Sequence, residues 1–192
     1  MLRLLVLFCF IEMGVTTMTA QGRTRRPMTE FTTDTAMVHD PVMAYEDGVY
    51  YMFSTGMGIQ LMTSSDRRSW TFKPGGVMGR DGIPAWTHDS VPGFRNHVWA
   101  PDIFRFNNRW WIAYSCSTFG RNTSAIGLIS SPTLATPHWT DEGCVITSRQ
   151  DRNNWNAIDA NICTDADGRP WMTFGSFWDG IQIIPLDSTM HA

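Results

Sequence analysis

Three aspartates at regular intervals are the residues of this sequence best suited to chemistry. Asp40, Asp102 and Asp159 each stand near the start of a segment in which a short apolar run leads into a turn and an aromatic run. If such segments repeat around a common axis, their carboxylates converge at one end of the fold. Converging carboxylates suit glycoside hydrolysis, in which one activates water, one protonates the leaving oxygen and a third tunes pKa values. The alternative is that each aspartate caps a turn or accepts bonds from backbone N–H groups.

The two interpretations do not apply equally to the three aspartates. Asp40 and Asp159 are the catalytic candidates, whereas Asp102 follows Pro101 inside its segment, which favours capping. His39 would bind a hydroxyl or orient a base, although a single histidine is more often structural. Aromatic residues divide into sugar-stacking candidates, which are Trp99, Phe119, Phe177 and Trp178, and strand residues expected in the core, which are Trp110, Trp111 and Trp171.

The elements that would position these residues are β-hairpins with a period of about sixty residues. The repeats span 39–55, 99–117 and 157–176, and their turns fall at 46–48, 107–108 and 165–168. Asp-Gly between alternating apolar runs predicts a hairpin. Phe53, Tyr114 and Phe174 align across the repeats, with spacings of 61 and 60 residues.

A further apolar stretch follows each hairpin, at 58–64, 125–131 and 180–186, and no segment has a helical period. Each unit therefore carries about four short strands, which predicts an all-β protein of the β-propeller type. A stacked β-sandwich is the structural alternative, but it does not account for the aligned aspartate and aromatic repeat.

Composition excludes several classes of protein. The chain has 192 residues, a formal net charge of −3 and 17% charged residues, which argues against a disordered charged tail. Without a dense Lys/Arg tract, no electrostatic case exists for nucleic acid or for an anionic membrane as partner. Nine tryptophans indicate either an aromatic β core or a surface that stacks on sugar rings.

The amino-terminal residues have the features of a targeting segment. Arg3 precedes an apolar run at 4–11, and small residues lead up to Ala20, which predicts a secretory signal over 1–20. A polar linker is expected over 21–36 and the folded domain over 37–192. The mature protein is then secreted, into the medium or the periplasm, and has no membrane partner.

Cysteine usage adds little. Cys9 would leave with the signal, and the remaining three have an irregular spacing that matches neither a disulfide framework nor a zinc site. Cys116, Cys144 and Cys163 are expected as small buried residues in strands, with a single bridge among them as the alternative.

Five motifs, in order along the chain, resemble glycoside hydrolase family 43, and within it the endo-α-1,5-L-arabinanases. They are HDP at 39–41, NHVWAPDI at 96–103, STFGRNTSAIGLISSPTL at 117–134, NAIDAN at 156–161 and GSFWDGIQ at 175–182. The similarity extends from about Met37 to Asp187. One departure is Ala160, where the family motif NAIDPN has proline.

The resemblance implies a five-bladed propeller that hydrolyses arabinan or arabino-oligosaccharides with inversion and needs no cofactor for the chemistry. Asp40 would be the general base, and Asp159 the carboxylate that raises the pKa of the acid and orients it. A structural calcium ion would sit in the channel of a full-length form. The substrate-contacting residues would be His39, Trp99, Phe119, Gly120, Asn156, Ala157, Ile158, Asp159, Ser176, Phe177 and Trp178.

The resemblance also implies a general acid that this sequence lacks. The family's acid is a glutamate at the start of the fourth blade, which at a period of about sixty residues falls near position 220, beyond Ala192. The glutamates present are Glu12, Glu30, Glu46 and Glu142, and none has the expected place. We therefore expect about three of five blades and no activity from this chain alone.

Two alternatives remain open at the level of the sequence. One is another family 43 activity, that of an α-L-arabinofuranosidase or a β-xylosidase. The other is a non-catalytic propeller that binds carbohydrate, which the missing acid favours and the retention of both Asp40 and Asp159 opposes.

Overall fold

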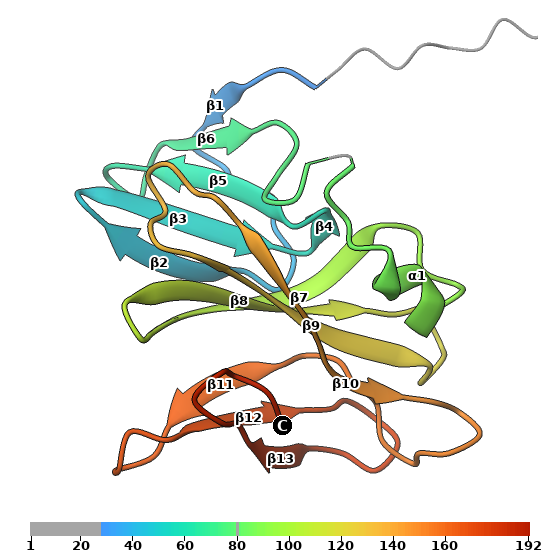
Figure 1. Cartoon of the computed structure of the whole chain (residues 1–192). Coiled ribbons are helices and arrows are strands. Elements are labelled where there is room, and N and C mark those ends of the chain that lie inside the picture. The colour runs from blue at the N-terminus through green and yellow to red at the C-terminus, as the bar shows by residue number, and fades with distance from the viewer. Residues whose placement is uncertain (1–27, 80) are drawn as a thin grey trace, which may run out of the picture.

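The chain forms an all-β fold, as predicted. A computed structural model describes residues 28–79 and 81–192, so the predicted signal and residues 21–27 of the predicted linker lie outside the described part. Three antiparallel sheets lie one on another, in the order of the sequence (Figure 1). The described residues contain one helix, α1 (Trp86–Ser90), and no helix there is long and apolar enough to cross a membrane.

The first sheet has the strand order β1-β6-β5-β3-β2. Its strands are β1 (Phe31–Thr33), β2 (Val42–Glu46), β3 (Val49–Ser54), β5 (Gln60–Ser64) and β6 (Trp70–Lys73). The predicted hairpin between β2 and β3 is confirmed, since Glu46 pairs with Val49 around a turn in which Asp47 and Gly48 both have positive φ.

The second and third sheets repeat this meander. The second has the order β10-β9-β8-β7-β4, and the third has the order β11-β12-β13. The predicted hairpins at 107–108 and 165–168 are both present. The strands are β4 (Gly56–Met57), β7 (His97–Phe106), β8 (Arg109–Cys116), β9 (Ser124–Ser131), β10 (Thr140–Ser148), β11 (Asn161–Thr164), β12 (Pro170–Phe174) and β13 (Gln182–Pro185).

Strand β8 carries the core on both of its faces. Ile112 and Tyr114 point into the cluster shared with the first sheet, where they meet Phe53. Trp111 and Ala113 point into the cluster shared with the third sheet. Successive side chains of a strand face opposite sides, so one fully buried strand joins all three sheets.

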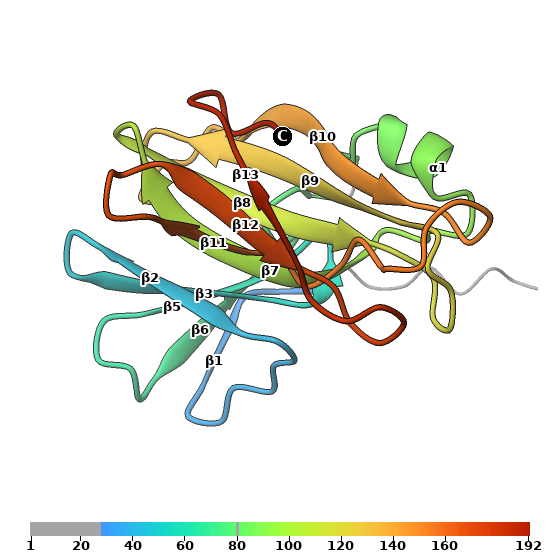
Figure 2. The same cartoon turned by 90° about the horizontal axis from the view of Figure 1, so that it is seen from below.

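The innermost strands of the three sheets, β2, β7 and β11, contact one another in sequence order (Figure 2). Each sheet then continues outward as a meander, which is the arrangement of propeller blades. The described residues do not form a closed ring. Large apolar side chains remain exposed on the outer faces of the stack, among them Met43 and Tyr45 on the first sheet and Ile183 on the third.

Three sequence expectations need correction. The predicted linker is wrong over Phe31–Thr33, which forms β1 because Phe31 pairs with Phe72 and their rings stack at 5.1 Å. The helix α1 was not expected, since five residues are too few to show a period. Cys163 is exposed rather than buried. The three described cysteines are free, and burial raises the pKa of the Cys144 thiol to about 11.

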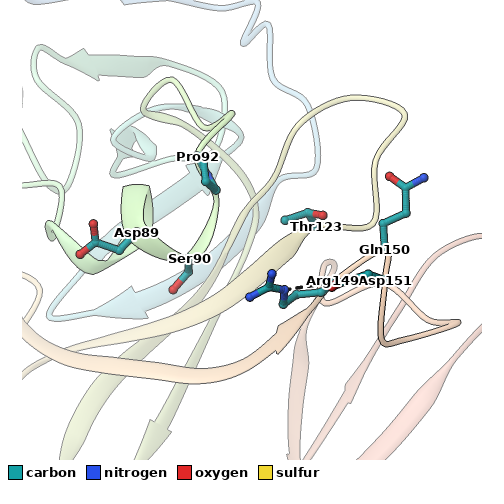
Figure 3. Close-up of a pocket in the computed structure, with 7 residues that line it drawn as sticks. All are labelled: Asp89, Ser90, Pro92, Thr123, Arg149, Gln150 and Asp151. Atoms are coloured by element: carbon teal, nitrogen blue, oxygen red, sulfur yellow. Dashed lines mark hydrogen bonds and ion pairs between the residues drawn. The ribbon is translucent and has the colours of Figure 1, made fainter.

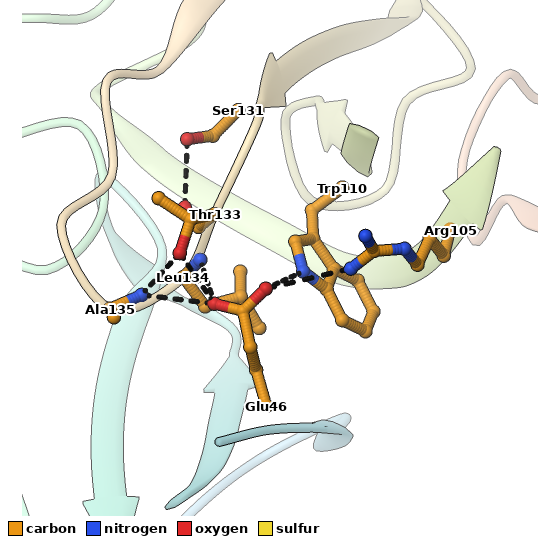
Figure 4. Close-up of polar contacts among 7 residues, drawn as sticks. All are labelled: Glu46, Arg105, Trp110, Ser131, Thr133, Leu134 and Ala135. Atoms are coloured by element: carbon orange, nitrogen blue, oxygen red, sulfur yellow. Dashed lines mark hydrogen bonds and ion pairs between the residues drawn. The ribbon is translucent and has the colours of Figure 1, made fainter. Parts of the chain in front are cut away.

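A buried carboxylate ties the first sheet to the second at the end away from Asp40 (Figure 4). The side chain of Glu46 is only 12% exposed, and its Oε1 lies 3.5 Å from Nη1 of Arg105. Four groups of the second sheet and its loop donate hydrogen bonds to it: Trp110 Nε1 at 2.6 Å, Thr133 Oγ1 at 2.7 Å, and the backbone N–H groups of Leu134 at 2.5 Å and Ala135 at 3.2 Å.

These donors decide the charge state of Glu46. Burial alone raises its pKa, but the hydrogen bonds from Thr133, Trp110 and the two backbone N–H groups outweigh burial, so the pKa is lowered. A carboxyl group whose pKa is lowered by folding stabilises the fold at pH values above its ordinary pKa. That contribution is lost as the pH falls through the lowered value.

We therefore expect Glu46→Gln to lower the free energy of unfolding by about 2 kcal/mol at neutral pH, because an amide N–H₂ faces groups that are themselves donors. Urea unfolding followed by tryptophan fluorescence measures this. The matched control is Glu30→Gln, which removes only an exposed ion pair with Lys73. A deficit that stays the same from neutral to strongly acid pH would contradict the assignment.

Candidate active site

Asp40, just before β2, is held by contacts with the side chains of Thr55 and His39. Its Oδ2 accepts a hydrogen bond of 2.9 Å from Thr55 Oγ1, and His39 Nε2 lies 3.3 Å from the same oxygen. Thr55 Oγ1 also accepts a 2.9 Å bond from the N–H of Ala100 in β7. One hydroxyl thus fixes the carboxylate and joins it to the second sheet.

Asp159 takes the corresponding place before β11. Its backbone N–H donates to Ser115 Oγ at the end of β8, at 3.0 Å, and its φ is 57°. Asp40 also has a positive φ, 50°. Left-handed backbone at a residue other than glycine is uncommon and is found most often where the surroundings enforce it, as at functional sites.

The negative charge of Asp40 acts on Asp159. Asp159 is exposed at the rim, yet partial desolvation raises its pKa, the negative charge of Asp40 raises it further, and His39 partly offsets these effects. Asp40 and Asp159, from different repeats, are thus near enough for the charge of one to act on the other, while their catalytic roles stay a prediction. A site with two interacting carboxylates of unequal environment is a pattern expected of acid–base chemistry.

Asp102 has the backbone-bonding role that its sequence position favoured. Its Oδ2 accepts a 2.8 Å hydrogen bond from the N–H of Ile162 in β11. Burial raises its pKa, against the hydrogen bonds from Ile162 and Asn161, which lower it. Asp102 thus joins the innermost strands of the second and third sheets.

Exposed aromatic residues flank the two aspartates on loops at the same end of the sheets. Phe119 is 93% exposed, Phe177 84% and Trp178 48%, although large apolar side chains are usually covered. Gly120 has a φ of 72°, which allows the chain to turn beside Phe119. Their side chains are open to solvent, and the predicted stacking on sugar rings stays a prediction.

Trp99 and Ser176 complete the rim. Trp99 lies partly exposed at an irregularity of β7, where the register with β8 shifts between Trp99 and Asp102, and its Nε1 donates to His97 Nδ1 at 3.2 Å. Ser176 is partly exposed in the loop after β12. The preceding residue, Gly175, donates its N–H to the carbonyl of Ile158 at 2.8 Å, which holds this loop against the segment that carries Asp159.

The remaining predicted substrate contacts are buried. Asn156 is 2% exposed, Ala157 0% and Ile158 7%, so their side chains lie beneath the surface of the cleft. Asn156 Oδ1 accepts a hydrogen bond from Ser124 Oγ at 2.6 Å, and Ser148 Oγ lies 3.5 Å from the same oxygen. In this structure the segment supports Asp159 from below, and Asp159 is its exposed member.

Residues 33–192 match the sequence model of Glycosyl hydrolases family 43. The chain belongs to this family.

Its relatives include enzymes named for both modes of arabinan cleavage. The extracellular endo-α-(1→5)-L-arabinanase 1 of Bacillus subtilis is 43% identical over 160 residues, which is 80% of this chain and 48% of the relative. The extracellular exo-α-(1→5)-L-arabinofuranosidase of Cellvibrio japonicus is also 43% identical, over 157 residues, 80% of this chain and 44% of the relative. The chain thus spans about half the length of the curated relatives it matches.

Solved structures agree with this assignment. An exo-1,5-α-L-arabinanase from a bovine ruminal metagenomic library has a TM-score of 0.77 at 53% identity, covering 81% of this chain and 51% of that one. The native Bacillus subtilis arabinanase has a TM-score of 0.78 at 41% identity, covering 82% and 55%. A Cellvibrio cellulosa α-L-arabinanase, solved with arabinohexaose, has a TM-score of 0.73 at 40% identity, covering 80% and 49%.

Sequence reasoning missed two residues of this candidate site, Thr55 and Ser115. Each hydroxyl holds one of the aspartates, yet neither belongs to a motif that names a function. A signal existed, because the aromatic strand of each repeat runs into a hydroxyl residue soon after Phe53, Tyr114 or Phe174.

The family resemblance implies a channel calcium, for which the described residues offer no ligand set. Within 28–79 and 81–192, no group of three His, Cys, Asp or Glu side chains is placed to hold a metal ion.

Asp40→Asn should lower the pKa of Asp159, because the substitution removes a negative charge that opposes ionisation. The pKa should stay above the ordinary range of an aspartate, since desolvation persists. Carboxyl ¹³C chemical shifts followed over a pH titration measure it. Asp34→Asn is the control, as this exposed aspartate bonds only to its neighbour Thr35; equal pKa values in the two variants would refute the coupling.

Ser148→Ala should destabilise the fold by about 1–3 kcal/mol, because it leaves buried groups without partners. Ser148 Oγ donates to the carbonyl of Asn122 at 2.6 Å and accepts from the N–H of Ala157 at 2.9 Å. Thermal or urea unfolding gives the change, with exposed Ser69→Ala as the matched control. A loss no larger than that of the control would show that these bonds are dispensable.

Proposed function

We propose that the protein to which this chain belongs hydrolyses α-1,5-L-arabinofuranosidic linkages in arabinan, with inversion at the anomeric carbon. The observation that carries the proposal is the pair Asp40 and Asp159, which come from different sheets and interact electrostatically at an exposed, aromatic-rimmed edge. The substrate is inferred from the relatives described above, which are named as arabinanases or as an arabinofuranosidase.

Asp40 would act as the general base. Its contacts with Thr55 and His39 both involve Oδ2, which within the described part of the chain leaves Oδ1 for the attacking water. Oδ1 takes a proton from that water while the water oxygen bonds to the anomeric carbon and the glycosidic bond breaks. The Thr55 hydrogen bond fixes the orientation of the carboxylate.

Asp159 would act on the group that protonates the leaving oxygen. Its charge, once ionised, disfavours ionisation of a neighbouring acid and so raises the pKa of that acid. Phe119, Phe177 and Trp178 would stack on sugar rings along the cleft, since their faces are open to solvent.

The general acid itself would come from outside these residues. Among the described glutamates, Glu30 pairs with Lys73, Glu46 is buried between the first two sheets, and Glu142 bonds Ser130. In an inverting enzyme the acid lies roughly 6.5–9.5 Å from the base, with water between them. We propose that the acid is a glutamate of a fourth blade. The three sheets would then be the first three blades of a five-bladed ring, and this chain alone would be inactive.

Secretion forms part of the same proposal. The Bacillus and Cellvibrio relatives are named as extracellular, and the polymeric substrate is met outside the cell. The predicted signal over 1–20 would provide the export. A channel calcium would belong to the complete ring rather than to the described residues.

Two rival functions are kept open by particular observations. The named endo and exo relatives have the same identity to this chain, so exo action on arabinan is the first rival. A carbohydrate-binding protein without activity is the second, because the described residues supply base and auxiliary carboxylate but no acid. Product analysis on linear arabinan distinguishes the first, and binding without turnover by a full-length form identifies the second.

The decisive experiment compares this chain with a hybrid in which the carboxy-terminal half of the Bacillus subtilis arabinanase follows it. We expect no hydrolysis of linear arabinan by the chain alone and measurable hydrolysis by the hybrid. Asp40→Ala in the hybrid should reduce kcat by about 10²–10⁴-fold, while Asp34→Ala should leave it unchanged. Turnover by the chain alone that disappears with Asp40→Ala would overturn the proposal that the acid lies elsewhere.

A further inference from the structure

A pocket outside the cleft lies at the same end of the second sheet (Figure 3). It has a volume of about 540 Å³, within the range of roughly 300–1,000 Å³ typical of small-molecule sites. Its walls come from the end of α1, from Thr123 just before β9 and from the turn at 149–151 after β10. Neither Asp40 nor Asp159 lines it, and every lining residue belongs to the described chain.

The side chains that line the pocket are mostly polar and nearly balance in charge, while its exposed surface is about half apolar. Asp89 and Asp151 supply carboxylates, Arg149 a guanidinium and Gln150 an amide, which gives a formal sum of two negative charges and one positive. Pro92 is the only apolar residue among those that line it. A ligand that offers both hydroxyl groups and C–H faces matches such a lining, whereas an anion meets a net negative charge.

The turn that carries these groups is fixed by its own hydrogen bonds. The N–H of Arg149 donates to Asn153 Oδ1 at 3.0 Å, and the carbonyl of Arg149 accepts from Asn153 N at 2.8 Å. Arg149 Nε lies 3.3 Å from Asp151 Oδ1, although both side chains are more than half exposed. The guanidinium and the carboxylate therefore face solvent at a defined mutual position, which lowers the entropic cost of binding.

The pocket also borders the cleft. Arg121 Nη1 donates to Gln150 Oε1 at 3.3 Å, and Arg121 belongs to the loop that carries Phe119 and Gly120. On the other side, Gly93 lies so close to Thr118 of that loop that an added Cβ would be 2.3 Å from the Thr118 hydroxyl oxygen. One loop thus has the exposed aromatic edge of the cleft on one side and the polar pocket on the other.

We propose that this pocket is a second carbohydrate site, which binds a neutral sugar unit of the arabinan outside the catalytic cleft. Carboxylates of Asp89 and Asp151 would accept hydrogen bonds from sugar hydroxyls, and the guanidinium of Arg149 would donate to them. A side branch or a neighbouring arabinan chain bound in the pocket would hold the polymer beside the loop at 117–123. The inference depends on the proposed function for the identity of the sugar.

The test is titration of the full chain, labelled with ¹⁵N, with α-1,5-linked arabinotriose. We expect amide shifts of two separate groups of residues, one around Asp89 and 149–151 and the other around Asp40 and Asp159. The double variant Arg149→Ala/Asp151→Ala should weaken binding at the pocket by about tenfold or more, since charged hydrogen bonds are lost, and leave the cleft shifts unchanged.

A matched control is available in the third sheet. Arg169→Ala/Asp167→Ala removes another exposed Arg–Asp pair whose two residues are also separated by two positions. This variant should leave both groups of amide shifts as they are in the parent chain. Shifts at the cleft alone, shifts at neither place, or a pocket response that survives Arg149→Ala/Asp151→Ala would each overturn the inference. Pocket shifts without cleft shifts would support it and count against the proposed cleft, whose activity the hybrid enzyme tests separately.

Discussion

Burial of β8 on both faces is the constraint on which the rest of this structure depends. Every side chain from Trp110 to Cys116 is buried, and alternate residues pack against the first and the third sheet. Apolar packing of this kind is strong but has no direction. It holds three sheets in a stack without deciding how far each is turned relative to its neighbour.

Polar contacts between sheets supply the missing direction. At one end, Glu46 of the first sheet is surrounded by donors of the second. Near the cleft, Thr55 bonds Ala100, Asp102 bonds Ile162 and Ser115 bonds Asp159. Each of these contacts is specific in geometry and costs free energy if it is left unmade. The register between sheets, and hence the separation of Asp40 from Asp159, follows from them.

The same end of the stack carries both places proposed to bind sugar. Several residues other than glycine in the loops there have left-handed backbone, among them Asn96, Phe177 and Trp178. A buried set of hydroxyl and amide groups that includes Ser124, Ser148 and Asn156 lies beneath them. A rigid support under exposed side chains is what a site needs if it is to bind an extended polymer without first being ordered.

The sequence by itself determined the all-β class, the three hairpins and the two aspartates, because strand alternation, Asp-Gly turns and recurring motifs are local patterns. It did not determine β1, since the pairing of Phe31 with Phe72 joins residues far apart in the chain. Nor did the sequence distinguish, within NAIDAN, the residue that faces the cleft from those that support it. Asp159 is exposed, while Asn156, Ala157 and Ile158 are buried. The bonding partners of Thr55 and Ser115 and the pocket at 149–151 were likewise decided by tertiary structure. Their roles depend on which surfaces meet when sheets stack, and that is a property of long-range packing rather than of spacing along the chain.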